Sequence, residues 1–576
     1  MQRLRPRYLV LIVSILLTMS GVALSANVQS AFGTVIVSEE SFVDAGGATI
    51  YSTLQRPVYA TDSNPLPGVV VIHGSLQNKE WLMAFGIELA RRGFVVLTID
   101  ANGHGNSDPG SGDAGTAALD YLADKDYVDE SEMGLIGHSM GGGYCWRAIN
   151  ESSVIVDALV LVGSGFANVS TIAYVPNTLV TVGDFDSLSS VPRDPTVLDP
   201  YFNVTNVEPG IRYGDFGEGT ARKLVLAKTN HLFETIDPVI VSESVEWMKE
   251  ALKDGVEDAH WLPSSDLSYP LWLVGGFLSL LGVLLTIFPL VLILLGIPFF
   301  KSLRGSPIAR QGVSGKDFLG KGALYGIIGA GTFFPFLAVG TILGFVIPFP
   351  QYNALPVMSW MLGSGLIAAL VLYIMIRRRD SEPSFREIAG LQEGFVSFLP
   401  GFLRALVLGT VVIAWLYGWT LLVDLGFVLD LRVFLPGFHD LMPRQALLVP
   451  LYFVIFFIYF AVEGMWLTGP LLTTSEGSWT KSQTIVTIKA MFIKCIPYVL
   501  LIAFEFGGGL LTGAALVPGM IGYSFLFFYA FTPWFAVATV ITMFAYQVTG
   551  NHYLGAILNG LICAWLLASI LSFRFF

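Results

Sequence analysis

The feature that most constrains this chain is a series of long apolar segments in its C-terminal half. From Leu271 onward, eight stretches are apolar and long enough to cross a bilayer as helices: about 271–299, 322–348, 355–376, 402–425, 446–468, 484–513, 521–546 and 552–573. A backbone in hydrocarbon must satisfy its own hydrogen bonds, so such segments fold as packed helices. We therefore expect residues 269–576 to form an all-α polytopic membrane domain of about eight transmembrane helices.

A further apolar run lies near the N-terminus. Arg3, Arg5 and Arg7 precede an apolar stretch that ends at about Ala26, so residues 1–26 are either a cleaved signal peptide or an uncleaved signal-anchor. Arginines stay on the cytoplasmic side, and the basic loops between the later spans follow the same rule. We expect a multi-pass integral membrane protein of the plasma membrane, with residues 27–262 outside the cytoplasm.

Residues 27–262 have the mixed composition of a folded water-soluble domain and hold most of the 44 acidic residues. The net charge of −12 argues against nucleic-acid partners, which need basic patches. Short β-branched runs alternate with amphipathic helical stretches, at about 68–72, 94–99, 133–136, 158–162, 178–182 and 223–227. Strands that are apolar throughout and separated by helices predict a mostly parallel sheet with helices on both faces.

The strongest chemical motif is Gly137-His138-Ser139-Met140-Gly141, which lies between a predicted strand and a predicted helix. A G-x-S-x-G sequence makes a sharp strand-to-helix turn that exposes the serine hydroxyl above the sheet. The glycines are needed because a Cβ atom would clash in that turn. Ser139 is therefore the candidate nucleophile.

Together with two further loops, this motif resembles the α/β-hydrolase family over residues 35–252. Ile72-His73-Gly74-Ser75-Leu76 resembles the oxyanion loop of the family, and the segment from Asp100 to Ser107 resembles its D-x-x-G-x-G-x-S loop. The resemblance implies that the backbone N–H groups of Ser75 and Met140 form the oxyanion hole. The pattern is similar to the dienelactone-hydrolase and serine-peptidase branches of the family.

A serine nucleophile needs a histidine base and a carboxylate that orients it. The family order of serine, acid and histidine implies that both partners follow Ser139. His231 comes after the last predicted strand, where the base of the family belongs, whereas His260 is at the membrane-proximal end. Asp186 matches the usual position of the acid, and Asp184 is the alternative acid.

Other reactive residue types have structural interpretations. His73, His104 and His138 are expected to form hydrogen bonds in tight loops, and Cys145 is expected to be packed in the core. We find no metal-ligand spacing and expect no metal or cofactor.

Only about 15 residues separate the strands at 158–162 and 178–182, too few for a helical lid. The site is then open, covered by residues 187–222, or roofed by the membrane part.

Three Asn-x-Ser/Thr sequons, at Asn150, Asn168 and Asn203, are candidate glycosylation sites if the domain is outside the cytoplasm. Several ionisable residues also fall within the predicted spans, where charge is costly and usually has a partner or a polar cavity. Glu463, Glu505 and Lys494 are the candidate intramembrane polar site.

These observations support three hypotheses about function. The first is a membrane-embedded serine hydrolase that cleaves an ester, thioester or amide, free or linked to a lipid or peptide, with membrane lipids as its surroundings. The second is an acyltransferase that uses the same triad on a lipid or glycan acceptor, because eight spans exceed what tethering requires. The third is a transporter or receptor with a hydrolase-like accessory domain.

Overall fold

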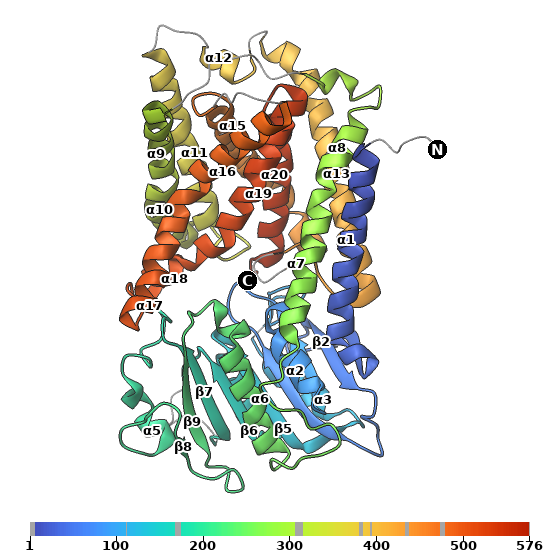
Figure 1. Cartoon of the computed structure of the whole chain (residues 1–576). Coiled ribbons are helices and arrows are strands. Elements are labelled where there is room, and N and C mark those ends of the chain that lie inside the picture. Colours follow the sequence, from blue (N-terminus) through green and yellow to red (C-terminus); the bar gives the residue numbers. More distant parts are fainter. Residues whose placement is uncertain are drawn as a thin grey trace.

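The computed structural model describes residues 6–110, 112–166, 174–305, 315–378, 384–391, 394–432, 437–472 and 479–574. Figure 1 shows an α/β domain below a bundle of long helices, with the C-terminus between the two parts. The two-part fold class expected from the sequence, a mostly parallel α/β domain joined to an all-α part, is confirmed.

In the described part of the chain, nine strands form one sheet in the order β1-β2-β4-β3-β5-β6-β7-β9-β8. The pairs from β4 to β9 are parallel, while β1, β2 and β8 are antiparallel to their neighbours. The bounds are β1 Val35–Val43, β2 Thr49–Pro57, β3 Leu66–Ile72, β4 Val95–Ile99, β5 Val128–His138, β6 Ala158–Val162, β7 Asn177–Gly183, β8 Arg212–Tyr213 and β9 Arg222–Ala227.

Helices cover both faces of this sheet. α2 (Met83–Ala90) and α6 (Pro238–Leu252) pack with Val69 and Val71 on one face. α3 (Ala114–Ala123) and α4 (Met140–Glu151) pack on the other face, while the short α5 (Asp199–Phe202) lies near the β8 edge. Successive strand residues point to opposite faces, so a strand that is buried on both sides has a continuous apolar sequence. The six strands predicted from such runs are all present.

The all-α part follows α6 and contains most of the membrane-type helices. The bounds of its elements are α7 Tyr269–Leu285, α8 Ile287–Leu294, α9 Gly315–Gly331, α10 Phe333–Val346, α11 Ala354–Arg377, α12 Phe385–Ile388, α13 Phe395–Phe427, α14 Pro443–Ala446, α15 Val449–Thr468, α16 Trp479–Ile502, α17 Gly508–Thr512, α18 Gly519–Ser524, α19 Leu526–Thr549 and α20 Tyr553–Ile570. Counting α1 (Pro6–Gln29) and joining consecutive short helices, nine helical stretches of the described residues are long and apolar enough to cross a membrane.

α1 and α7 run side by side at the edge of the bundle (Figure 1). Small residues allow this close approach: a Cβ atom on Gly21 would lie 2.4 Å from the backbone nitrogen of Ser279 and 2.5 Å from the carbonyl oxygen of Gly275. Ser25 also donates a hydrogen bond of 2.9 Å to the carbonyl of Trp272. Helices in lipid associate through such small-residue contacts, so α1 is packed as an integral part of the bundle.

The α/β domain is held on the bundle by directional hydrogen bonds to the loop that follows β4. Arg444 contacts the carboxylate of Asp108 at 2.5 Å and donates to the carbonyl groups of Asn106 and Ser107. Gln445 donates to the carbonyl of Gly105 at 2.9 Å. Because three of these four acceptors are backbone carbonyl groups of one loop, the contact sets the orientation of the domain as well as its position.

A second contact joins the β3 side of the domain to the segment between α13 and α14. The carboxylate of Glu80 lies 3.0 Å from the Lys79 ammonium, 3.4 Å from His439 Nε2 and 3.7 Å from the Arg432 guanidinium. Lys79, Arg432 and His439 are buried. Charges taken out of water need partners, so this cluster makes separation of the two parts costly.

We expect Gly21→Ala to destabilise the protein, because the added methyl group would collide with the α7 backbone. Overpacking of this kind costs about 1–3 kcal/mol. The matched control is Gly418→Ala in α13, where nothing lies within 4 Å of an added Cβ atom. Thermal unfolding of both purified variants in detergent is the measurement. Equal midpoints for Gly21→Ala and the wild type would show that α1 does not pack on α7.

Candidate active site

Ser139 lies at the turn between β5 and α4, above the carboxyl end of the sheet. Its backbone has φ 53° and ψ −116°, a conformation that is strained for a residue with a side chain. The flanking glycines are required sterically: a Cβ atom on Gly137 would lie 2.6 Å from the backbone of Gly141, and one on Gly141 would lie 2.1 Å from the carbonyl oxygen of Ile72. This strained turn presents the serine hydroxyl outward.

The structure brings Ser139, His231 and Asp186 together. His231 Nε2 lies 2.9 Å from Ser139 Oγ, and His231 Nδ1 lies 3.0 Å from Asp186 Oδ2. In the neutral ring, Nδ1 keeps its proton toward the carboxylate, so Nε2 is free to accept the hydroxyl proton. The arrangement has the hydrogen-bond order of an activated serine nucleophile.

The alternative acid, Asp184, is partly exposed. Among the described residues, the carboxylates paired with His231 are those of Asp186 and Glu234, and Asp184 has no such contact. Asp186, in contrast, is 1% exposed, and its second carboxylate oxygen accepts a hydrogen bond of 2.7 Å from the backbone nitrogen of Leu188. That bond holds the carboxylate toward His231.

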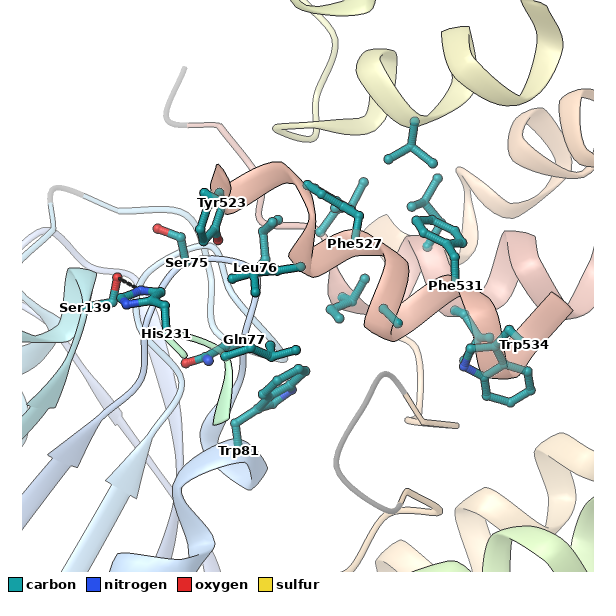
Figure 2. Close-up of a pocket in the computed structure, with 18 of the residues that line it drawn as sticks. Ser75, Leu76, Gln77, Trp81, Ser139, His231, Tyr523, Phe527, Phe531 and Trp534 are labelled. Carbon is teal, nitrogen blue, oxygen red and sulfur yellow. Dashed lines mark hydrogen bonds between the residues drawn. The ribbon is translucent and has the colours of Figure 1, made fainter. Parts of the chain in front are cut away.

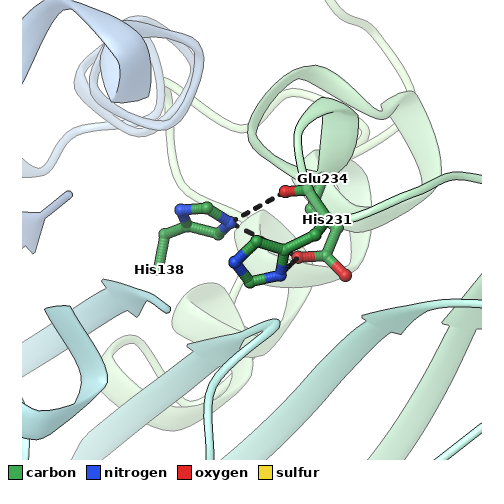
Figure 3. A group of neighbouring side chains, drawn as sticks. All are labelled: His138, His231 and Glu234. Atoms are coloured by element: carbon green, nitrogen blue, oxygen red, sulfur yellow. Dashed lines mark hydrogen bonds and ion pairs between the residues drawn. The ribbon is translucent and has the colours of Figure 1, made fainter. Parts of the chain in front are cut away.

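A second carboxylate, which the sequence did not reveal, also faces His231. Glu234 is fully buried, and its Oε2 lies 3.3 Å from His231 Nδ1 and 3.3 Å from His138 Nε2 (Figure 3). Its Oε1 accepts a hydrogen bond of 2.7 Å from the backbone nitrogen of Gly183. The only sequence signal was an acid three residues after the candidate base, which is a common occurrence.

His138 connects this carboxylate to the oxyanion loop. Its Nδ1 donates to Gln77 Oε1 at 2.9 Å, and the same amide oxygen accepts a hydrogen bond from the backbone nitrogen of Gly74. His138 therefore has a structural role in a tight loop. His138 thus lies between Glu234, whose Oε2 is 3.3 Å from its Nε2, and Gln77, which is bonded to the loop that carries Ser75.

The buried charges shift several pKa values. Burial alone would lower the pKa of His231, but the carboxylates of Asp186 and Glu234 raise it to about 10. Burial alone would raise the pKa of Glu234, but His231 and His138 lower it to about 2. The two carboxylates thus stabilise the imidazolium form of His231, the form that the ring takes when it receives the serine proton.

His138, His231 and Glu234 also have the spacing of a metal-ligand group, with ligand atoms within 4.8 Å of one another. Their atoms already have other partners. His231 Nε2 faces Ser139, and His231 Nδ1 faces two carboxylates, which is the environment of a protonated nitrogen. The cluster is therefore explained as a proton-holding network of the serine site.

The two backbone N–H groups expected to form the oxyanion hole lie beside Ser139. Ser75 lines the same cavity as Ser139, and its hydroxyl contacts the sulfur of Met140 at 3.4 Å. Among the described residues, no acceptor is bonded to the backbone nitrogen of either Ser75 or Met140. Free donors next to the nucleophile are what a developing oxyanion requires.

The site opens into a cavity of about 120 Å³ between the α/β domain and the bundle. Figure 2 shows Ser139 and His231 at one end, with Phe527, Phe531 and Trp534 following one another along α19. Tyr523 lies over the site, with its ring centroid 6.0 Å from that of His231. The bundle therefore roofs the site.

Residues 187–222 do not line this cavity. Instead, Val191, Leu198, Phe202 and Val207 of this insertion pack against β7 and β9 near the edge of the sheet. Of the three arrangements left open by the sequence, the roof formed by the helical part is the one observed.

The candidate intramembrane polar residues are not all together. Lys494 Nζ lies 2.5 Å from Glu463 Oε2, and Tyr325 donates to the same oxygen at 3.1 Å. Glu505 lies in a π-helical turn, Ala503–Gly507, and accepts a hydrogen bond of 3.1 Å from Tyr529. The structure thus brings Glu463 and Lys494 together and gives Glu505 a separate partner.

The remaining candidates have structural surroundings. His73 is buried, accepts a hydrogen bond from the backbone nitrogen of Ala101, and has a pKa that burial lowers to about 3. His104 and Cys145 are also buried.

Of the three sequons, Asn150 and Asn203 lie at exposed positions, and Asn168 lies outside the described residues.

The α/β domain is similar to known hydrolases. Residues 23–261 match the PET hydrolase-like family, and the match ends before α7 begins. The chain is similar to a bis(hydroxyethyl) terephthalate hydrolase from Streptomyces coelicolor, with 28% identity over 228 residues that cover 38% of this chain and 66% of the relative. It is also similar to cutinase 2 from Thermobifida cellulosilytica, with 27% identity over 211 residues that cover 35% and 72%.

A solved CIB-like hydrolase from Thermoplasma acidophilum is also similar, with 16% identity, a TM-score of 0.28, and coverage of 38% of this chain and 99% of that chain. The chain spans between about a third and about three quarters of the length of the curated relatives it matches. The resemblance to α/β-hydrolases is confirmed, and residues 23–261 are similar to esterase-type hydrolases. The two relatives are a bis(hydroxyethyl) terephthalate hydrolase and a cutinase.

We expect Glu234→Gln to move the acidic limb of the pH–rate profile to lower pH by roughly 1 unit, because one of the charges that raise the pKa of His231 is removed. A general base works only when deprotonated, so activity rises as the pH passes its pKa. The measurement is kcat/KM for a soluble short-chain ester against pH. Glu243→Gln, at a partly exposed ion pair with Lys223, is the matched control. An unchanged limb in Glu234→Gln would contradict the role of Glu234.

Proposed function

We propose that the protein is a multi-pass membrane serine esterase in which Ser139 is the nucleophile, His231 the base and Asp186 the residue that orients His231. The observation that carries this proposal is the continuous Ser139–His231–Asp186 hydrogen-bond chain at the strained turn after β5. The similarity to cutinases and a terephthalate-ester hydrolase supports an ester as the substrate class.

The reaction follows from the geometry. Ser139 Oγ attacks the ester carbonyl carbon while His231 Nε2 takes the hydroxyl proton, and the backbone N–H groups of Ser75 and Met140 bind the oxyanion. The ester C–O bond then breaks, and the alcohol leaves with the proton from His231. A water molecule, deprotonated by His231, attacks the acyl-serine and releases the carboxylic acid and the free serine.

Two charged neighbours assist the proton transfers. Asp186 and Glu234 both face Nδ1 of His231, so the imidazolium that forms in each transfer is stabilised in a buried setting. Electrostatic interactions are stronger where water is excluded. The roof formed by Tyr523 and α19 supplies that exclusion.

We further propose that the nine apolar helical stretches span the membrane and that the hydrolase domain lies outside the cytoplasm. Their length and composition support the first statement, and Arg3, Arg5 and Arg7 at the start of the first apolar segment support the second. The packing of α1 against α7 supports its retention as an anchor.

We expect a small fluorophosphonate to label the wild-type protein covalently, whereas Ser139→Ala and His231→Ala lose the label. Serine is a weak nucleophile unless a base takes its proton, so labelling reports the activated pair. Cys145→Ser serves as a control for changes on the helix that follows the nucleophile. Persistent labelling of folded Ser139→Ala would place the nucleophile elsewhere and would overturn the proposal.

Asp186→Asn and Asp184→Asn form a matched pair, because both remove one carboxylate from the same loop. We expect Asp186→Asn to lower kcat for ester hydrolysis by roughly 10²- to 10⁴-fold, since His231 loses the partner that sets its tautomer. Asp184→Asn should stay within about twofold of the wild type, because Asp184 does not contact His231. The reverse ranking would assign the role to Asp184.

A further inference from the structure

The cavity that begins at Ser139 has a polar end and an apolar body. Its polar lining residues gather where the α/β domain contributes, at Ser75, Gln77, His138, Ser139 and His231. The rest of the lining is mostly hydrocarbon and aromatic. The α/β domain adds Leu76, Trp81 and Leu232, and most of the other lining residues come from α11, α15, α19 and α20 of the bundle. An apolar pocket with convergent polar groups at one end is the usual form of a ligand site.

The body of the cavity follows one face of α19. Phe527, Ala530, Phe531 and Trp534 line it at the spacing of neighbours on a single helix face. From Tyr523 at the triad to Trp534, the helical rise gives a length of roughly 16 Å. That length is close to half of the roughly 30 Å hydrocarbon core of a bilayer.

The walls of the body belong to helices that are candidate membrane spans. Phe456 comes from α15, Trp534 from α19, and Cys563 and Leu567 from α20. A hydrocarbon chain in this space would exchange lipid surroundings for apolar side chains without exposure to water. The ester carbonyl attached to that chain would then lie at the polar end, beside Ser139.

We infer that the substrate is a lipid ester, and that the cavity holds its long unbranched hydrocarbon chain while the carbonyl group lies at Ser139. This inference rests on the proposed function and adds to it the substrate class and the role of the helical part. α19 and α20 form the chain-binding part of the enzyme, and the depth of the cavity sets the preferred chain length.

The experiment measures kcat/KM for p-nitrophenyl esters from acetate to dodecanoate, as monomers below their micelle concentrations, with the full chain in nanodiscs. Each buried methylene is expected to raise kcat/KM by roughly three- to fourfold until the chain fills the cavity. Dodecyl acetate, compared with p-nitrophenyl dodecanoate, distinguishes a chain on the alcohol side from one on the acyl side.

Ala530→Trp tests the cavity directly, because it adds a large side chain to the middle of the lining. We expect this variant to lose at least tenfold in kcat/KM for the dodecanoate and to stay within about threefold for the acetate. Ala536→Trp is the matched control: it lies on the same helix, is partly exposed and does not line the cavity. Cys563→Phe, from the facing helix, should shift the preference in the same direction.

The outcomes separate the two proposals. Fluorophosphonate labelling of each variant shows that the triad is intact and the protein folded. A labelled wild type with no dependence on chain length, or equal effects of Ala530→Trp and Ala536→Trp, would overturn the cavity inference and leave the esterase proposal standing. Absence of both labelling and ester hydrolysis in the folded wild type would overturn the esterase proposal itself.

Discussion

The contact between the carboxyl ends of the parallel strands and the helical bundle is the constraint on which the rest of this structure depends. Open α/β sheets carry their sites at this edge, where the loops converge. In this protein the same edge rests on the bundle, through Arg444 and Gln445 bonded to the loop at 103–108 and through the Glu80 cluster. The site therefore faces apolar helices, and its cavity exists only because the two parts are docked.

The docking also explains how several charged groups can be buried together. His231, Asp186 and Glu234 are all removed from water, which would be costly if any of them lacked a partner. Each carboxylate accepts a backbone hydrogen bond in addition to facing the histidine. In a setting that excludes water, the charges of these carboxylates act strongly on the pKa of His231.

Ser139, His231 and Asp186 could be proposed from the sequence because each follows a predicted strand, and strands of β-branched residues bounded by turns are local features. Glu234 could not be identified as a neighbour of the site, because its contact with His138 joins two segments that are far apart in the sequence. His138 ends β5, whereas Glu234 follows β9. β1 was also missed, because its half-exposed residues mix valine with serine and glutamate and lack a continuous apolar run.

The two-part architecture and the turn at Ser139 can be inferred from local residue patterns. Long apolar runs with few charges favour helices of membrane-spanning length, and the turn needs glycines at 137 and 141 because any larger residue collides. The residues that cover the site, the carboxylates that face His231 and the direction of the cavity are visible only in the folded chain. Those features depend on contacts between side chains that are far apart in the chain, such as the contact of Tyr523 with His231. Local residue patterns do not predict such contacts.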